Sequence, residues 1–232
     1  MISKLKLHNI RGGNKTDLEQ KKYTIGVGLS LGNKWFTPEN IIEEIKWALE
    51  YSKDKVVVYV ADSIHAINIS VRSRRSIESA RRIAFREGEE LFSKVKEGLK
   101  FLSDEQLNKI SFVKWDEIVD GSFTNKLVYL RARYNESGLF QDTIHAIVRN
   151  HVSHEDRKFS DDDIHMLGSY IVEELPECAN RVPMKGIIVD AYMYPQDNEL
   201  VAFIERIQKG EVFPEIKEKI MDTEPKVFLE VR

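Results

Sequence analysis

The stretch Tyr23-Thr24-Ile25-Gly26-Val27-Gly28-Leu29 decides the fold, because it is an apolar run of strand length that ends at Ser30. A helix over 38–52 follows, which begins at Thr37-Pro38 and carries apolar residues at helical spacing. Residues 55–61 then form a second continuous apolar run, of the kind found in parallel strands that are covered on both faces. A strand, a helix and a strand in this order form a right-handed crossover, so the sequence predicts neighbouring parallel strands.

The remainder of the chain continues this alternation and contains no internal repeat, low-complexity tract or flexible linker. The pattern predicts a long helix over 74–101, a strand over 111–114, helices through much of 116–151, a polar turn over 151–160, a helix begun by Ser160 and stopped by Pro176, a strand over 186–191, a helix over 199–208 and a strand over 226–231. We therefore expect one α/β domain spanning residues 1–232.

The composition is that of a soluble, cytoplasmic protein. The chain has 232 residues, of which 42% are hydrophobic and 31% charged, enough for one substantial core. Its one cysteine, Cys178, excludes an internal disulfide framework. No N-terminal segment resembles a signal peptide, and no apolar run approaches the roughly 20 residues of a membrane span. A net charge of −3 means that any contact with RNA must use a local basic patch.

Ser30 is a candidate nucleophile, because it directly follows a strand and precedes a turn. Gly28 lies two residues before it, and Gly32-Asn33 follow where the chain must turn, so the backbone around the hydroxyl has room for an acyl group. Loops at strand ends are where open α/β sheets hold their ligands. The alternative is that Ser30 only shapes the turn, and this segment by itself does not decide between the two.

A second candidate site lies on the helix that Ser160 begins. At about 100° per residue, Glu174 falls about 20° from Leu167 on the apolar side of this helix, and Tyr170 is its i,i+4 neighbour. A carboxylate beside the core calls for a cationic partner, so the pair is suited to accept a substrate ammonium group. The alternative is a solvated glutamate at the edge of the apolar stripe, beside a tyrosine that only packs.

Residues 71–86 hold six arginines and a single acidic residue, Glu78. If the predicted helix is straight, Arg75, Arg82 and Arg86 lie within an arc of about 40°. Such a cationic stripe on an acidic protein is suited to contact the phosphates of RNA. The alternative is a solvated helix face with intrahelical ion pairs, because acidic residues follow directly after it.

No cofactor or metal ion is expected. The G-x-G at Gly26–Gly28 lacks the third glycine of a dinucleotide-binding fingerprint, and the sequence contains no phosphate-binding P-loop. The segment His151-Val152-Ser153-His154-Glu155-Asp156 falls in the predicted polar turn without a matched third ligand, which argues against a metal site.

Several segments together resemble the cyclodipeptide synthases, enzymes that join the amino acids of two aminoacyl-tRNAs into a cyclic dipeptide. The segments are Gly28-Leu29-Ser30-Leu31-Gly32-Asn33-Lys34-Trp35-Phe36, Val148-Arg149-Asn150, Tyr170-Ile171-Val172-Glu173-Glu174-Leu175-Pro176 and Tyr194. The resemblance covers essentially the whole chain. It implies a Rossmann-like fold, with a mostly parallel sheet flanked by helices, similar to the catalytic domain of tyrosyl- and tryptophanyl-tRNA synthetases, which are class Ic enzymes.

The resemblance also implies a role for each matching residue. Ser30 would accept the first aminoacyl group, while Tyr170 and Glu174 would hold its α-amino group. Tyr194 would relay a proton in the closing cyclisation. No ATP is needed, since an aminoacyl-tRNA is already an activated ester. The sequence contains no obvious base for Ser30, so the resemblance leaves its activation open.

By the same resemblance, Gly28 and Asn150 would shape the pocket and position the ester. Asn33 matches the asparagine of one group of the family, whereas Tyr194-Pro195 matches the proline-bearing other group, so the subfamily stays open. Tyr192 lies two residues before Tyr194 and is the alternative proton relay.

By position, Gly26, Glu177 and Tyr192 would line the pocket for the first side chain. Gly26 would leave space, and Glu177 would supply an acceptor that is costly to bury unpaired. We therefore expect a polar or cationic first side chain, with histidyl the best in size. The alternative is that Glu177 turns outward after Pro176 and contributes nothing.

The partners implied are two aminoacyl-tRNAs as substrates, and we expect a monomer or weak dimer that binds neither DNA nor a membrane. Two other functions stay open. One is a serine acyltransferase or hydrolase that uses Ser30 on a small ester, and the other is a non-catalytic, tRNA-binding module with a synthetase-like fold.

Overall fold

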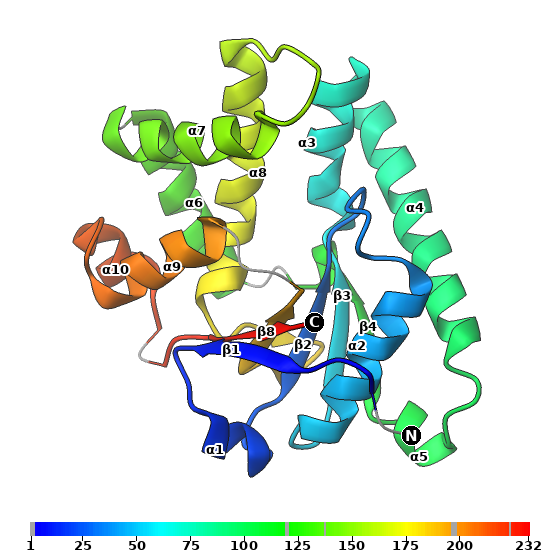
Figure 1. Cartoon of the computed structure of the whole chain (residues 1–232). Coiled ribbons are helices and arrows are strands. Elements are labelled where there is room, and N and C mark those ends of the chain that lie inside the picture. Colours follow the sequence, from blue (N-terminus) through cyan, green and yellow to red (C-terminus); the bar gives the residue numbers. More distant parts are fainter. Residues whose placement is uncertain (1–2, 119–120, 137, 196–198, 223) are drawn as a thin grey trace.

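A six-stranded sheet runs through the middle of the structure in the order β1-β8-β7-β2-β3-β4 (Figure 1). The computed structural model describes residues 3–118, 121–136, 138–195, 199–222 and 224–232. β1 pairs antiparallel with β8, and the other neighbours in this sheet are parallel. The strands are β1 (Leu7–Arg11), β2 (Ile25–Leu29), β3 (Val56–Val60), β4 (Ile110–Lys114), β7 (Ala191–Tyr194) and β8 (Val227–Val231), with a separate antiparallel pair of β5 (Pro183–Met184) and β6 (Ile187–Ile188).

Helices cover both faces of this sheet (Figure 1). They are α1 (Lys15–Glu19), α2 (Pro38–Tyr51), α3 (Asp62–Ser73), α4 (Ile77–Gly98), α5 (Asp104–Leu107), α6 (Gly121–Glu136), α7 (Gly138–Val152), α8 (Asp161–Ala179), α9 (Glu199–Lys209) and α10 (Pro214–Ile220). α2 and α4 share an apolar core with one face of the sheet, and α6 to α10 share another with the opposite face. No helix among the described residues is long and apolar enough to cross a membrane. The predicted α/β fold is confirmed.

β2 lies at the centre of the sheet and presents a different surface to each helix layer. Ile25, Val27 and Leu29 are buried in the core that α2 and α4 complete. Because side chains alternate between the faces of a strand, Gly26 and Gly28 point to the opposite face, beneath α8. The larger aromatic side chains of the neighbouring strands therefore have room to lie over β2 on that face.

Most predicted elements are confirmed with small shifts at their ends. The strands predicted over 23–29, 55–61, 111–114 and 226–231 are β2, β3, β4 and β8, and the helices predicted over 38–52 and 199–208 are α2 and α9. The helices expected within 116–151 are α6 and α7, and residues 119–120 and 137 of that range lie outside the described residues. The sequence patterns did not predict β1, α1, α3, α5 or α10.

The helix predicted over 74–101 is wrong at its N-terminal end, because two helices meet there. Arg74 ends α3 in the left-handed conformation, with a φ of 57°. Ser76 then caps α4 by accepting a hydrogen bond from the backbone N–H of Ser79 at 3.3 Å. α3 starts directly after β3 without a side-chain cap, which explains why the sequence carries no start signal for it.

Pro176 does not stop α8, contrary to expectation. The helix continues to Ala179, although a proline inside a helix removes one backbone hydrogen bond. Its last turn is buried, and the side chain of Asn180 donates to the carbonyl of Pro176 at 2.8 Å. The predicted start is confirmed, since Ser160 caps α8 by accepting from the N–H of Asp163 at 3.2 Å.

The strand predicted over 186–191 is also wrong. Lys185 and Gly186 adopt φ values of 50° and 78°, which form the tight turn between β5 and β6. The strand that joins the main sheet, β7, begins at Ala191. The predicted polar turn over 151–160 begins later than expected, because α7 continues to Val152.

Candidate active site

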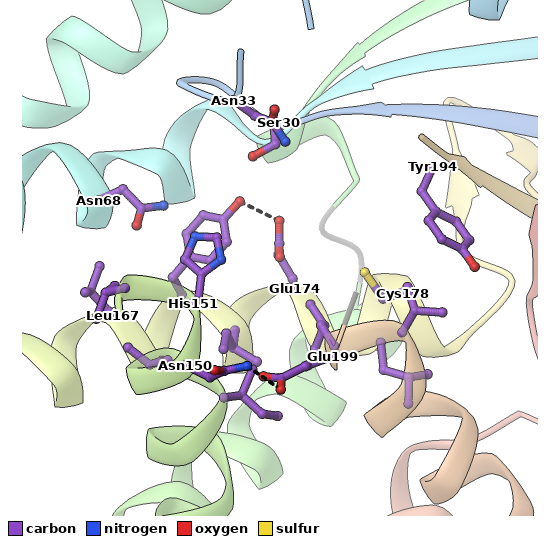
Figure 2. Close-up of a pocket in the computed structure, with 18 of the residues that line it drawn as sticks. Ser30, Asn33, Asn68, Asn150, His151, Leu167, Glu174, Cys178, Tyr194 and Glu199 are labelled. Carbon is purple, nitrogen blue, oxygen red and sulfur yellow. Dashed lines mark hydrogen bonds between the residues drawn. The ribbon is translucent and has the colours of Figure 1, made fainter. Parts of the chain in front are cut away.

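A cavity of about 440 Å³ opens at the carboxyl ends of β2 and β7 (Figure 2). β2 pairs on one side with β3, the next strand along the chain, and on the other side with β7, which comes much later. Where strand order reverses in this way, the connections leave in opposite directions and a crevice forms beyond the strand ends. Ser30 and Glu174 line the cavity from opposite walls, Ser30 directly after β2 and Glu174 on α8.

The turn that carries Ser30 is held by its own polar contacts. Gly32 has a φ of 79°, a conformation that favours glycine. Asn33 Oδ1 accepts a hydrogen bond from the backbone N–H of Trp35 at 2.9 Å, and Trp35 Nε1 donates to Glu44 Oε1 at 2.7 Å. Burial raises the pKa of the Glu44 carboxyl to about 7. These contacts hold the backbone that presents Ser30, and Asn33 itself lines the cavity.

Tyr170 and Glu174 form the expected pair on α8. The Tyr170 hydroxyl donates to Glu174 Oε1 at 2.6 Å (Figure 2, dashed line). Burial raises the pKa of Glu174 to about 8, the negative charge of Glu177 adds to this, and the bond from Tyr170 opposes it. Burial also raises the pKa of Tyr170 well above its usual value, and the hydroxyl of Ser30 opposes this rise. Tyr170 therefore lies between the carboxyl to which it bonds and the wall that carries Ser30.

With a pKa of about 8, the Glu174 carboxyl is mostly protonated at neutral pH while the site is empty. A substrate ammonium group beside it would favour the ionised form and form a charged hydrogen bond. The α-amino group has an ordinary pKa of about 7.7–8.0, so carboxyl and amine are closely matched in proton affinity. A proton can thus pass between them with little change in free energy, as general acid–base catalysis requires.

Tyr192 and Tyr194 lie two residues apart on β7 and line the cavity from the same face of the sheet. Their rings stack with centroids 6.1 Å apart and planes inclined by 18°. Figure 2 shows Tyr194 on the side of the cavity away from Ser30 and Glu174. Both candidates for the proton relay therefore share the cavity, and the choice of Tyr194 stays a prediction.

The two glycines of β2 do not enlarge the cavity, which corrects their expected roles. A Cβ atom on Gly26 would lie 2.7 Å from Val189 Cγ1 and 3.1 Å from Tyr59 Cε1. On Gly28 it would lie 3.0 Å from the Tyr59 hydroxyl oxygen and would overlap the ring of Tyr192. The space above β2 is already filled by these side chains, so the glycines allow tyrosine rings, and not an acyl group, to approach the strand.

Adding one methyl group at Gly28 is therefore expected to destabilise the fold. We expect Gly28→Ala to lower the free energy of unfolding by about 1–3 kcal/mol, the usual effect of overpacking a filled core. Urea denaturation followed by circular dichroism measures this. The matched control is Gly121→Ala, where a Cβ atom would meet no atom within 4 Å. Equal stability of the two variants would show that Tyr59 and Tyr192 can move away from Gly28 without loss.

Glu177 is not a free acceptor for a substrate side chain, which corrects a second expectation. Its carboxylate pairs with Lys226, the residue before β8, and both side chains are buried. Lys226 Nζ also donates to the backbone carbonyl of Glu177 at 2.7 Å. Glu177 therefore neither turns outward nor waits for a cationic substrate. The expectation of a histidyl first substrate loses its basis.

Polar side chains surround the mouth of the cavity opposite Ser30. Asn150 on α7 donates a hydrogen bond to Glu199 at the start of α9, and His151 lies beside them (Figure 2). From α3, Asn68 and Arg72 complete this rim. Only Asn150 was expected here. Asn68 and Arg72 were not expected because α3 was not predicted, and His151 was weighed only as a metal ligand in a predicted turn.

One wall of the cavity is apolar. It is lined by Ile171 and Cys178 on α8 and by Leu200 and Ile204 on α9. The apolar residues of α9 recur at helical spacing, but such a pattern shows only that a helix has a buried face and not which elements it packs against. Among the described residues, no group of three His, Cys, Asp or Glu side chains is placed to hold a metal ion.

The arginine stripe is smaller than predicted, because Arg75 does not lie on α4. It precedes the cap of that helix, in the link from α3. Arg82 and Arg86 are exposed one turn apart on α4, and Arg86 lies 3.8 Å from the carboxylate of Glu90. Arg74 is exposed but forms a bidentate pair with Asp163. The exposed arginines of α4 are therefore Arg81, Arg82 and Arg86, of which Arg86 pairs with Glu90.

Solved structures share this fold. A cyclo(L-leucyl-L-phenylalanyl) synthase matches with a TM-score of 0.71 at 18% identity, over 100% of this chain and 99% of that one. A cyclodipeptide synthase from Bacillus thermoamylovorans matches with a TM-score of 0.73 at 16% identity, over 94% and 91%. One from Candidatus Glomeribacter gigasporarum, bound to Phe-tRNAPhe, matches with a TM-score of 0.60 at 16% identity, over 93% and 92%.

No protein-family model matches the sequence, and no curated protein matches it. At the identities of the solved structures, their likeness to this chain shows a common fold over nearly the whole length of both partners. The Rossmann-like architecture expected from the sequence motifs is thereby confirmed. The chemistry at Ser30 and Glu174 must be argued from the cavity itself.

Proposed function

We propose that this chain is a cyclodipeptide synthase, which joins the amino acids of two aminoacyl-tRNAs through an aminoacyl group carried on Ser30. One observation carries the proposal: Ser30 and the Tyr170–Glu174 pair share a single cavity, in a fold common to solved cyclodipeptide synthases. A nucleophilic hydroxyl and an acceptor for ammonium would hold one amino acid by both of its reactive ends. The bound Phe-tRNA of one such structure supports aminoacyl-tRNA as the substrate class.

In the first step, Ser30 Oγ attacks the ester carbonyl of an aminoacyl-tRNA. A new ester bond forms to Oγ, the bond from the carbonyl carbon to the ribose oxygen breaks, and the serine proton leaves with the ribose hydroxyl. Tyr170 and Glu174 hold the α-amino group of the acyl-enzyme. The serine has no histidine base in this mechanism, and the substrate supplies the activation, because its ester is already reactive.

In the second step, the α-amino group of the acyl-enzyme attacks the second aminoacyl-tRNA. The amine must be neutral to attack, and Glu174 is suited to take its proton, because burial gives this carboxylate a raised pKa of about 8. The peptide bond forms as the second tRNA leaves. The free amine of the dipeptide then attacks the ester on Ser30, closes the six-membered ring and restores the hydroxyl, with Tyr194 as the proposed proton relay.

The apolar wall of the cavity supports apolar substrate side chains. Leu200, Ile204 and Ile171 offer no hydrogen-bond partner, so a polar side chain placed among them would lose its water without compensation. Several polar groups of the rim already have partners, since Asn150 bonds to Glu199 and Arg72 bonds to Asn68 and Glu155. We therefore infer that leucyl, methionyl or phenylalanyl groups fit this wall better than polar ones.

The deciding experiment is expression in a bacterium followed by mass spectrometry of the medium. The expected result is a new cyclic dipeptide that contains at least one apolar amino acid and disappears with the Ser30→Ala variant. Hydrolysis of a small ester without any such product would instead indicate a serine hydrolase. Binding of tRNA without turnover would indicate a non-catalytic module.

The arginines of α4 provide a further prediction. If Arg82 and Arg86 contact tRNA phosphates, the double variant Arg82→Ala/Arg86→Ala is expected to weaken aminoacyl-tRNA binding. It should also flatten the dependence of log Kd on log salt by about one unit for each lost contact. The measurement is a binding titration over a range of salt concentrations.

The matched control replaces Lys100 and Lys109, two exposed lysines on either side of α5. In Figure 1, α5 lies at the opposite end of the structure from α7. Their removal takes away the same charge and should leave the salt dependence unchanged. An equal effect of both double variants would mean that net charge, and not a phosphate contact on α4, governs binding.

A further inference from the structure

A buried ion pair lies directly behind the ammonium site. Lys226, which precedes β8, is fully buried, and Glu177 in the last turn of α8 is 1% exposed. Lys226 Nζ donates to the carboxylate of Glu177 and to its backbone carbonyl. Removing two charges from water is costly, and an apolar pair of similar volume would pack as well or better. Packing alone therefore does not explain this pair.

The pair is placed to act on Glu174. Glu177 follows Glu174 by three residues on α8, so the two carboxyl groups lie on one side of the helix about one turn apart. The thiol of Cys178 donates to the second oxygen of Glu177 at 3.4 Å. Lys226 therefore contacts Glu177 at two points, its carboxylate and its backbone carbonyl, and fixes this side chain at the buried end of α8.

The other titratable groups around Glu174 are few. Tyr170 bonds to it from the preceding turn of α8, and Tyr192 faces it from β7. Cys178 lies beside it on α8 with a thiol whose pKa is raised well above its usual value by burial. His151 on α7 and Glu199 on α9 line the mouth of the same cavity. Among these groups, Glu177 is the one whose negative charge raises the pKa of Glu174.

We propose that the Glu177–Lys226 pair is an electrostatic control element that sets the pH at which Glu174 can bind a substrate ammonium group. This role of the Glu177–Lys226 pair depends on the proposed function only for the identity of the substrate. Glu177 acts through Glu174 and is a positioning residue in this sense, with no contact to the reacting atoms. While no substrate is bound, the negative charge of Glu177 favours the protonated, neutral form of Glu174. When the substrate amine enters as an ammonium group, its positive charge stabilises the ionised form of Glu174.

The expected pH dependence follows from the sign of this effect. A charge that raises the proton affinity of Glu174 moves its ionisation to higher pH, and removal of that charge moves it to lower pH. Two charges one helical turn apart in a buried site interact strongly enough for a shift of about one pH unit. Ammonium binding would then begin at a pH lower by about the same amount.

The test measures the carboxyl itself. Protein labelled with ¹³C at the glutamate carboxyls is titrated by NMR, and the Glu174 signal is identified by its absence in Glu174→Gln. The double variant Glu177→Leu/Lys226→Leu removes the pair without leaving a buried charge unpaired, and Glu177→Gln removes the negative charge alone. We expect the midpoint of Glu174 to fall by about one unit in Glu177→Gln, and by less in the double variant, because that variant also removes the positive charge of Lys226. The pH at which kcat/KM rises on the acid side of its profile should decrease by about the same amount as the midpoint of Glu174.

The matched control is Glu173→Gln, which removes a carboxylate from the same helix. Glu173 pairs with Arg131 outside the cavity, so the midpoint of Glu174 should stay unchanged. An unchanged midpoint in a folded Glu177→Gln variant overturns the proposal. If the midpoint falls but the wild type makes no cyclic dipeptide, the proposed function fails while the electrostatic control of Glu174 stands.

Discussion

Replacing Ser30 with alanine is expected to lower cyclic dipeptide formation by about a thousand-fold or more, because the acyl group then has no oxygen to which it can be transferred. Cys178 also lines the cavity but cannot take over this role. Burial raises the pKa of its thiol well above the usual value, and the neutral thiol is a poor nucleophile. The fold should stay intact, since the substitution removes a single oxygen from a turn.

Intact-protein mass spectrometry is the direct measurement. After incubation with a charged tRNA, the wild type should gain the mass of one aminoacyl group, and Ser30→Ala should not. The matched control is Ser169→Ala, which removes the hydroxyl of a half-buried serine on the same helix as Glu174. An alanine variant at position 30 that turns over normally would exclude the acyl-enzyme mechanism.

Replacing Glu174 with glutamine is expected to lower kcat/KM by about a hundred-fold or more. Glutamine keeps the shape and can still accept the hydrogen bond from Tyr170, but it cannot ionise to balance an ammonium group or accept its proton. Loss of one partner of a buried charged pair usually weakens binding by about 2–5 kcal/mol. The wild type should also gain activity as the pH rises toward 8, as Glu174 ionises, whereas the variant should lack this limb.

The free energy of unfolding should decrease as the pH rises toward 8, whereas the activity increases. The pKa of Glu174 is raised in the folded state from 4.5 to about 8, so the unfolded chain releases this proton first and folding becomes less favourable as the pH rises through this range. Glutamine has no such proton, and Glu174→Gln should be at least as stable as the wild type at pH 8. Glu173→Gln serves as the control for both measurements. A drop in stability that matches the loss of activity would mean that Glu174 is structural.

Much of the fold could be predicted from the sequence because it depends on short-range patterns. The apolar run before Ser30, the Thr37-Pro38 helix start and the apolar run over 55–61 each lie within a few residues, and together they predict parallel strands joined by a helix. The predictions failed where local signals were missing or overruled. α3 has no cap, and Pro176 lies in a buried turn whose packing outweighs the lost hydrogen bond.

Some residues of the candidate site could be predicted individually from the sequence. Ser30 at a strand end and Glu174 beside an apolar stripe are local observations, and the motif resemblance connected them. The sequence could not show what fills the space around β2, because that depends on the register of strands that are distant in the chain. Tyr59 and Tyr192 come to lie over Gly28 only when β3 and β7 pair on either side of β2.

The sequence by itself determined the alternation of strands and helices, the position of Ser30 after the central strand, and the Tyr170–Glu174 pair one helical turn apart. Only the tertiary structure decided that these two groups face each other across one cavity and that Glu177 belongs to Lys226. The physical reason is that periodicity along a chain records which side of an element is buried. Packing between elements decides which residue the buried side contacts, and no local sequence pattern specifies that residue.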